Sequence, residues 1–467
     1  MRRLFVGIWS LVLPLSFELC PLSFAAPAGA RPNIVFVLID DFGYADSGAY
    51  GAKDIRTPNM DRLAREGVKF TDFYANAPVC TPTRCAFITG RWQQRVGFEW
   101  AMGFSADSYR VVGTEWVKEP DIHALGLPTT VPTLPKMLKA AGYATGAFGK
   151  WHLGFKDEYS PTKHGFDEYF GELLGHSDYY THAYYDGTYA LRDGLKPVKV
   201  EGYLTDLINQ RAVAFVKKHA REPFFLYVPH LAVHCPFQPP GRPKPSVTKA
   251  NMYEGDRRTY AAMVEKVDEG VGMLLAELEK QGVADNTLFV LSSDNGGERY
   301  SDNSPLFHHK STLWEGGIRV PCLMRWPARL PKGKVTSQVG ITMDLSATFA
   351  AVAFGVPPSG GPLPAKAGTP NFDGINLLPI LTGEQPEQTR TLAWRIDRTG
   401  RQQKAVRHGQ WKYLQDGNVE MLFDLSTDIG ERRDVFFQHP EIFADLKARL
   451  KAWEDEMAKE PTQFLVK

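Results

Sequence analysis

The chain has 467 residues and a net charge of +1, with 43% apolar and 23% charged residues. These proportions are ordinary for a soluble globular protein, and the chain is longer than one simple core needs. Because there is neither a basic excess nor an acidic run, the composition argues against a nucleic-acid partner and against a solvating tail.

The N-terminal segment predicts a secretory signal. Two arginines precede an apolar stretch at residues 4–17, and a small-residue cleavage site ends at Ala25. The alternatives are a buried helix or a membrane anchor, but the run is short for a bilayer and Pro14 interrupts it. We therefore expect residues 1–25 to be removed on export to a periplasmic, extracellular or lysosomal-type compartment. No later segment is apolar enough to cross a membrane, so stable membrane insertion is not expected.

Buried strands are the next predicted elements. Continuous runs of β-branched and aromatic residues are typical of strands that helices cover on both faces. Such runs occur at Asn33–Ile39 and at residues 143–148, 223–228 and 287–291. Helical stretches lie between the strands, at residues 57–67, 133–141 and 260–281. This alternation predicts a doubly wound α/β sheet.

A smaller region follows a change in composition. Residues 356–370 are rich in Pro and Gly and predict a linker. Beyond it lie strand-like pieces at residues 391–396, 410–414 and 421–425. The chain ends in an amphipathic helix that carries Ile442, Leu446, Leu450, Trp453 and Met457. The predicted division is a main α/β domain at 31–356 and a C-terminal subdomain at 371–467.

Oxygen ligands follow two of the predicted strands. Asp40 and Asp41 come directly after Asn33–Ile39, and Asp294 and Asn295 come shortly after the strand that starts at residue 287. In open α/β sheets, ligands bind at the carboxyl ends of the strands. Carboxylates gathered there would repel one another unless a hard cation, Ca²⁺ or Mg²⁺, lay between them. The alternative is that each Asp caps a helix or a turn.

Basic side chains follow other strands and predict a pocket for an anion. They are Lys150, His152, His230, His234, His308, His309 and Lys310. A helix that begins near Thr81 would add the amides of its N-terminus. Zinc is disfavoured, because the histidines lack the close spacing of zinc motifs and the cysteines are not paired as C-x-x-C.

One motif carries a resemblance to a known family. The stretch Cys80-Thr81-Pro82-Thr83-Arg84 resembles the C-x-P-x-R signature of the type I sulfatases, which depend on formylglycine. Other motifs of the family occur in this chain in the same order as in the family. These motifs are Asp40-Asp41, residues 149–154, His234-Cys235-Pro236, Asp294-Asn295-Gly296, Lys310 and residues 314–317. The similarity extends over about residues 31–438. The stretch at 165–182 is most similar to arylsulfatases of the arylsulfatase B, or N-acetylgalactosamine-sulfatase, type.

The resemblance implies a fold and a modification. The fold would be an alkaline-phosphatase-like mixed sheet flanked by helices, with a C-terminal α+β subdomain that carries a small antiparallel sheet. A formylglycine-generating enzyme would oxidise Cys80 to Cα-formylglycine. Its hydrated form has two hydroxyls: one attacks sulfur, and the other expels sulfate by restoring the aldehyde. Cys85 is expected to be a buried apolar side chain rather than a disulfide partner of Cys80.

The resemblance also implies roles for matching positions. The metal ligands would be Asp40, Asp41, Asp294, Asn295 and the formylglycine at Cys80. Lys150 and Lys310 would bind the sulfate, and Arg84 would orient the diol. His152 would accept a proton when sulfate leaves.

The leaving-group side and the entrance are assigned with alternatives. His234, alone or together with Lys310, would donate toward the leaving oxygen, and His230 is an alternative. His176, Asp178 and His182 would line the entrance, or they are simply polar loop residues.

The expected activity is hydrolysis of an aryl sulfate or of a sulfated carbohydrate. One alternative is a phosphate or phosphonate ester hydrolase of the same superfamily. Another is an inactive secreted carbohydrate-binding protein, which is disfavoured because every expected catalytic position is filled. A thiol-redox role is also disfavoured, because Cys80 and Cys85 lack the C-x-x-C geometry.

Overall fold

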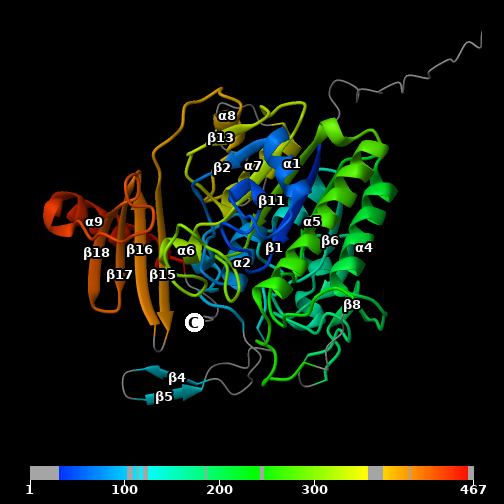
Figure 1. The fold of residues 1–467 in the computed structure, drawn as a ribbon, viewed down its shortest axis with the longest axis horizontal. Helices are drawn as coiled ribbons and strands as arrows, with labels where there is room; N and C mark the ends of the chain where they lie inside the picture. Colours follow the sequence, from blue (N-terminus) through cyan, green and yellow to red (C-terminus); the bar gives the residue numbers. More distant parts are fainter. Residues whose placement is uncertain are drawn as a thin grey trace, which may run out of the picture.

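The structure is a computed structural model that describes residues 31–102, 109–112, 115–118, 125–184, 187–241, 247–355, 372–398 and 401–460. The expected signal at 1–25 and the linker at 356–370 lie outside the described residues. In Figure 1 a large α/β body lies beside a four-stranded sheet, which is drawn in orange and red.

A ten-stranded mixed sheet forms the centre of the α/β body, in the order β13-β2-β12-β11-β1-β10-β6-β7-β8-β9. These strands are β13 (Lys334–Thr336), β2 (Val68–Phe70), β12 (Cys322–Arg325), β11 (Thr287–Ser293), β1 (Asn33–Ile39), β10 (Phe224–Pro229), β6 (Ala144–Phe148), β7 (Glu168–Glu172), β8 (Leu191–Asp193) and β9 (Lys196–Pro197). β1 pairs in parallel with both β10 and β11, whereas β12 pairs antiparallel with β11. The predicted mixed α/β sheet is confirmed, and β1 lies in its middle.

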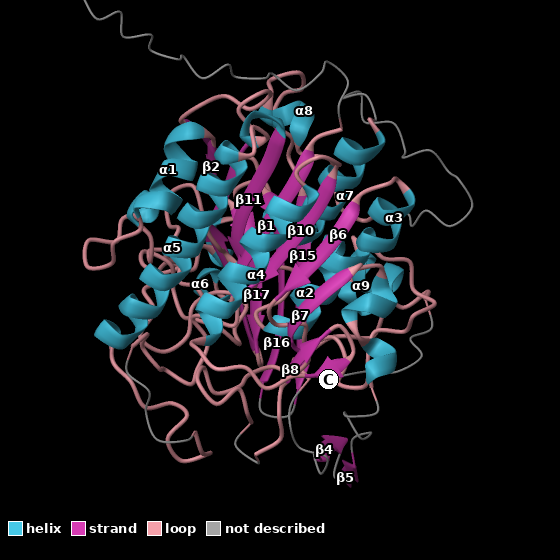
Figure 2. Cartoon of the chain, turned by 90° about the vertical axis from the view of Figure 1, so that its right-hand side faces the viewer, coloured by secondary structure: helices cyan, strands magenta, loops and turns pink. Residues whose placement is uncertain are grey.

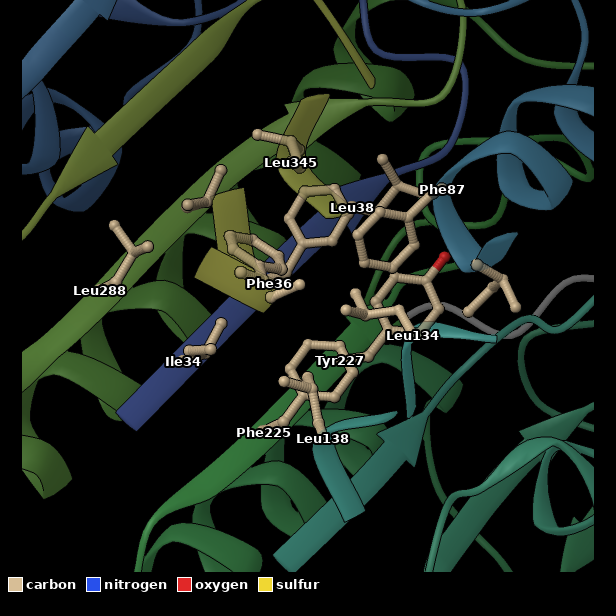
Figure 3. Packing of buried hydrophobic residues seen from close by; sticks show 14 of the residues in the cluster. Ile34, Phe36, Leu38, Phe87, Leu134, Leu138, Phe225, Tyr227, Leu288 and Leu345 are labelled. Atoms are coloured by element: carbon tan, nitrogen blue, oxygen red, sulfur yellow. The ribbon is translucent and has the colours of Figure 1, made fainter. Parts of the chain in front are cut away.

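Both faces of the sheet are covered by helices, as Figure 2 shows. On β1, Ile34, Phe36 and Leu38 point into one core cluster, while the alternate residues point into another. The first cluster includes residues of α2 (Cys80–Thr89), α3 (Leu134–Ala140) and α7 (Thr342–Phe354). The second includes residues of α1 (Pro58–Glu66), α4 (Leu204–His219) and α5 (Arg257–Lys280). Figure 3 shows Phe36 of β1 and Phe87 of α2 in the first cluster, and their ring centroids are 4.6 Å apart.

The C-terminal subdomain is an antiparallel sheet with a helix on one face. Its strands are β15 (Thr391–Arg398), β16 (Arg401–His408), β17 (Trp411–Asp416) and β18 (Val419–Asp424), and its helix is α9 (Pro440–Met457). α9 packs through Phe443, Leu446 and Leu450 against one face of the sheet. The other face packs against the α/β body, where Trp394 lies beside Tyr74 with ring centroids 5.3 Å apart.

The remaining regular elements of the described chain are short. They are β3 (Phe73–Tyr74), β4 (Tyr109–Val112), β5 (Glu115–Lys118), β14 (Gly340–Ile341), α6 (Glu315–Ile318) and α8 (Leu378–Leu381), with several single 3₁₀ turns between them. Among the helices of the described residues, none combines the length and the apolarity that a bilayer span requires.

Candidate active site

Four acidic or thiol side chains meet where β1 and β11 end. Asp40 follows β1, Asp294 follows β11, and Cys80 is the first residue of α2. One ligand atom from each of Asp40, Asp41, Cys80 and Asp294 lies within 4.8 Å of the others, and all four residues are buried. The predicted convergence at the carboxyl edge of the sheet therefore exists in the structure.

Asp41 lies between two basic side chains. Its Oδ2 accepts a hydrogen bond from Lys310 Nζ at 2.7 Å and lies 3.7 Å from His234 Nε2. Burial by itself would raise the pKa of Asp41, but the charges of Lys310 and Lys150 lower it below its usual value. Asp41 is therefore a carboxylate, which is the form that a cation needs.

Arg84 connects the carboxylates to the helix that carries Cys80. It lies four residues after Cys80 in α2, so both side chains are on one face of the helix. Its guanidinium donates to Asp294 Oδ2 at 2.8 and 3.0 Å and to the Lys150 carbonyl at 2.9 Å. Arg84 is 0% exposed, so this pairing fixes Asp294 inside the protein.

The oxygen ligands fit a hard divalent cation. Burial and the charge of Asp40 raise the pKa of Asp294 above its usual value, although Arg84 opposes them. The Oδ1 atom of Asn295 is buried and has no hydrogen-bond partner among the described residues. A cation between these oxygens would offset the repulsion of the carboxylates and give Asn295 Oδ1 a partner.

Cys80 itself is unsuited to thiolate chemistry. Its Sγ lies 3.3 Å from Asp40 Oδ1, and burial together with the Asp40 charge raises the pKa of the thiol well above its usual value. All four cysteines that the structure describes are free and buried. The expectation that Cys85 is a buried side chain without a disulfide is confirmed.

Lys150 and His152 follow β6 in a segment held by its neighbours. The amides of Trp151 and His152 donate to the carbonyls of Glu172 and Leu173 at 2.9 and 3.1 Å. Lys150 Nζ donates to Asp40 Oδ2. Burial and then the charge of Lys150 lower the pKa of His152 well below its usual value, so the ring is neutral.

His234 faces the cluster from the loop after β10. Its Nδ1 lies 2.7 Å from the Cys235 carbonyl, so in the neutral ring Nδ1 carries the hydrogen and Nε2 offers a lone pair toward Asp41. Burial, and then the charge of Lys310, lower the pKa of His234 to about 3. The ring can donate toward a leaving group only after it takes a proton, which a bound anion would favour.

The alternative candidate, His230, lies apart from the charged groups. It is buried at the end of β10, and its backbone amide donates to the Leu38 carbonyl at 2.9 Å. Burial alone lowers the pKa of His230 to about 3, with no contribution from a charged neighbour. The geometry therefore favours His234 over His230 on the leaving-group side.

The three predicted entrance residues occupy different surroundings. His176 stacks on His234, with ring centroids 6.4 Å apart and planes at 10°. Asp178 accepts hydrogen bonds from the amides of Tyr180 and Thr181 and from Gln238. His182 Nε2 lies 3.0 Å from the Gly202 carbonyl. The structure thus brings His176 to the cluster, whereas Asp178 and His182 are buried and brace neighbouring chain segments. His308 and His309 are exposed beside Lys310.

Two contacts of His152 were missed by the sequence reasoning. The Met102 carbonyl lies 2.7 Å from His152 Nε2, and a Cβ added at Gly175 would lie 2.7 Å from the ring. A backbone acceptor has no side-chain signature, so no signal in the sequence could have identified Met102. Gly175 lies within the stretch 165–182 that resembles the family, but nothing in the sequence indicates that it packs against His152.

The assembled site can bind a tetrahedral anion between a cation and two lysines. Lys150 pairs with Asp40 and Lys310 with Asp41, and α2 begins at Cys80 with its N-terminal amides. His152 and His234 add neutral rings that can accept protons. Such an arrangement suits attack on a sulfate or phosphate ester.

Comparisons with known proteins identify relatives of this chain. A family model described as Sulfatase matches residues 32–356. N-acetylgalactosamine-6-sulfatase of Homo sapiens is 36% identical over 378 residues, which cover 76% of this chain and 67% of the relative. The crystal structure of Ps i-CgsB in complex with k-i-k-neocarrahexaose has 34% identity and a TM-score of 0.79, and the match covers 93% of this chain and 95% of that one. Phosphonate monoester hydrolase of Agrobacterium radiobacter shares the fold at 18% identity and a TM-score of 0.64, over 91% of this chain and 96% of that one.

Proposed function

This chain belongs to the sulfatase family and is a sulfuric ester hydrolase, and we propose that its natural substrate is a sulfated carbohydrate. The observation that carries the proposal is the position of Cys80, in a C-x-P-x-R segment, at the start of α2 and against Asp40. The names of two relatives, an N-acetylgalactosamine-6-sulfatase and a protein bound to a neocarrahexaose, support a carbohydrate ester.

The metal would be held by Asp40, Asp41, Asp294 and Asn295 together with the modified residue at Cys80. The ligand set is made of oxygens, which supports Ca²⁺, with Mg²⁺ as the alternative. When bound, the cation would polarise the sulfate ester and favour an ionised oxygen nucleophile. Arg84 holds Asp294 in place through an ion pair and keeps a positive charge beside this carboxylate.

The modified residue would be a formylglycine made from Cys80. In its hydrated form it would supply two hydroxyls on one carbon, one for attack on sulfur and one for release of sulfate. Arg84 lies one helical turn away and would orient this group. The conversion of Cys80 to formylglycine would require a formylglycine-generating enzyme as the maturation partner.

Lys150 and Lys310 would bind the non-bridging oxygens of the sulfate. Both ammonium groups are ion-paired with carboxylates, Lys150 with Asp40 and Lys310 with Asp41, and both are buried. In a buried site, such pre-oriented charges stabilise developing negative charge more strongly than they would in water.

His152 and His234 would move protons on opposite sides of the sulfur. The Nδ1 atom of His152 is buried, has no hydrogen-bond partner among the described residues and is free to accept a proton. His234 lies beside Lys310 and Asp41, where it would protonate the departing sugar oxygen. His176, stacked on His234, would border the sugar.

We also propose that the protein is exported to a periplasmic, extracellular or lysosomal-type compartment.

The deciding experiment combines a substrate panel with a mass measurement. Mature protein is assayed on defined sulfated mono- and oligosaccharides, on an aryl sulfate and on phosphate mono- and diesters. We expect sulfate release from a sugar sulfate, an aldehyde at position 80 by peptide mass spectrometry, and loss of turnover after chelation that Ca²⁺ or Mg²⁺ restores. Full turnover by protein with unmodified Cys80 would refute the mechanism, and a preference for phosphate esters would refute the substrate.

A further inference from the structure

The ring of His152 is fixed in one tautomer by its surroundings. A carbonyl oxygen can only accept a hydrogen bond, so the 2.7 Å contact between Met102 O and His152 Nε2 requires the hydrogen on Nε2. The neutral ring then has its lone pair on Nδ1. Phe155 stacks on the ring with centroids 6.5 Å apart, and the ring lies so close to Gly175 that a Cβ added there would be 2.7 Å from it.

The Met102 carbonyl is held in turn by contacts at both ends of its segment. The Met102 amide donates to Thr81 Oγ1 at 3.0 Å, and Thr81 directly follows Cys80 in α2. Three residues before Met102, Glu99 accepts two hydrogen bonds from Arg395, at 2.7 and 2.8 Å. Arg395 belongs to β15, so a residue of the C-terminal subdomain holds the segment that orients a residue of the α/β body.

The Glu99–Arg395 pair is held by two hydrogen bonds, which restrict the motion of both side chains. Glu99 is buried at 6% exposure, and the two-pronged contact uses the planar fork of the guanidinium. Arg395 is additionally placed over the Trp453 ring at 5.7 Å and lies 3.6 Å from Glu454, both on α9. Breaking the pair would free Glu99 and, through it, the short segment to Met102.

We propose that Arg395 is a positioning residue for His152, acting through Glu99 and the Met102 carbonyl, which keeps Nδ1 of His152 unprotonated and facing the site. The inference rests on the proposed function for the part that His152 plays, but the position and tautomer of the ring can be measured without turnover. It gives the C-terminal subdomain a share in the proton transfer, although the contacts of the ring come from Met102 and Phe155 and not from the described residues of that subdomain.

The test compares three variants with a matched control. Arg395→Ala removes the pair, Arg395→Lys keeps one charged contact, and Glu99→Gln keeps the shape of the partner without its charge. The control is Lys404→Ala, because Lys404 lies opposite Arg395 on β16 and pairs with Glu454 at 2.9 Å. Protein labelled with ¹⁵N-histidine is compared by NMR with the His152→Gln variant, which assigns the His152 signals. Turnover of 4-nitrophenyl sulfate is measured on the same samples.

We expect the wild-type ring to show a protonated Nε2 and an unprotonated Nδ1, and Arg395→Ala to show mixed tautomers. Because small misplacements of a reacting group are costly, kcat should fall roughly 10–100-fold in Arg395→Ala while KM changes less than about threefold. Arg395→Lys should recover part of kcat, and Lys404→Ala should match the wild type in both measurements.

Three results would overturn the proposal: an unchanged tautomer with unchanged kcat in Arg395→Ala, an equal loss in Lys404→Ala, or a wild-type ring protonated at Nδ1. Should Arg395→Ala not fold, Glu99→Gln decides, since unaltered tautomer and kcat there contradict the proposed link. A wild-type protein that hydrolyses no sulfate ester would refute the proposed function, and the NMR result would still decide the positioning role.

Discussion

Asp41 and His152 both adopt left-handed backbone conformations, with φ angles of 57° and 58°. Such conformations cost a non-glycine residue about 1–3 kcal/mol and persist where the surroundings impose them. Lys310 holds the Asp41 side chain, and the Met102 carbonyl holds the His152 ring. Strain is therefore located at two residues of the proposed metal and proton-transfer machinery.

Removal of His234 should affect poor leaving groups most. A nitrophenolate departs without a proton, whereas a sugar alkoxide does not, and general acid catalysis is worth roughly 10²–10⁴-fold where a proton is needed. We expect His234→Ala to lower kcat/KM for sugar sulfates by about that factor, and for 4-nitrophenyl sulfate far less. The measurement is kcat/KM across aryl sulfates of graded leaving-group pKa and one sugar sulfate. If the dependence on leaving-group pKa stays as in the wild type, Lys310 becomes the better candidate for the acid.

Removal of His152 should affect all substrates alike. Its proposed proton transfer follows departure of the alcohol, so the identity of that alcohol should not matter. We expect His152→Ala to lower kcat by roughly 10²–10⁴-fold on sugar and aryl sulfates, and to show a pre-steady-state burst of nitrophenol. Stopped-flow absorbance measures the burst, and the same experiment on His234→Ala is the control. A slow variant without any burst would place His152 in the first step instead.

At the scale of elements, α2 shows how a helix end fixes the site. The helix begins at Cys80, ends at Thr89 and is capped by Gly90, whose φ is 67° and whose amide donates to the Ala86 carbonyl. A Cβ added at Gly90 would lie 2.0 Å from the Phe372 ring. The end of the helix thus needs glycine for two reasons, its backbone conformation and its neighbour.

A substitution at Gly90 tests this reading. Left-handed backbone costs an alanine about 1–2 kcal/mol, and overpacking typically adds about 1–3 kcal/mol. We expect Gly90→Ala to lower the free energy of unfolding by roughly 2–5 kcal/mol, measured by urea denaturation. The matched control is Gly282→Ala, where φ is 71° and no heavy atom lies within 4 Å of the new Cβ. Equal losses in the two variants would contradict the role of Phe372.

The elements also separate what the sequence could predict from what it could not. β1, β10 and β11 were predictable because they are continuous apolar runs buried on both faces. β16 was missed because its buried residues include Gln403 and Arg407, which conceal the apolar pattern. Short strands such as β2 and β12 have too few residues to show the repeating pattern of apolar residues from which strands are predicted. In the site, motif residues such as Asp40 and Asp294 were predictable, whereas the Met102 carbonyl depends on how two distant segments pack.

At the scale of the whole molecule, a buried ionic cluster joins the C-terminal sheet to helix α6 of the α/β body. Lys412 of β17 pairs with Glu315 of α6 at 2.8 Å and with Glu431 at 2.7 Å, and all three side chains are 0% exposed. Lys412 also donates to the Leu313 carbonyl, and Gln403 of β16 accepts from the Leu313 amide, each at 2.8 Å. The segment that carries Lys310 is thereby attached to the C-terminal sheet.

This cluster predicts a dependence of stability on pH. Burial and then the charge of Glu315 raise the pKa of Glu431 to about 7, against the opposing effect of Lys412. Since the folded pKa exceeds the unfolded value, this contribution to stability is complete below about pH 4.5 and is lost as the pH rises toward 7.

Glu431→Gln imitates the protonated side chain and should therefore remove the loss of stability that the wild type shows as the pH rises toward 7. Relative to the wild type, the free energy of unfolding of the variant should rise by an amount on the order of 1–3 kcal/mol between pH 5 and pH 8. Urea denaturation at the two pH values measures it, with Glu420→Gln, a partly exposed partner of Lys447, as the control. An identical pH dependence in wild type and Glu431→Gln would mean that Glu431 titrates normally.

Because β1 lies in the middle of the sheet, the sheet can be completed only long after Cys80 has been synthesised. β1 is paired by β10 and β11, and β11 ends at Ser293, roughly 200 residues after Cys80. At ~5–20 residues per second, translation needs about 10–40 s to cover that distance. Until then the sheet against which α2 packs is incomplete, and Cys80, which is 2% exposed in the folded protein, would be accessible to the proposed oxidising enzyme. The proposed conversion of Cys80 thus competes with folding for a limited interval, and slower synthesis should give a more completely converted enzyme.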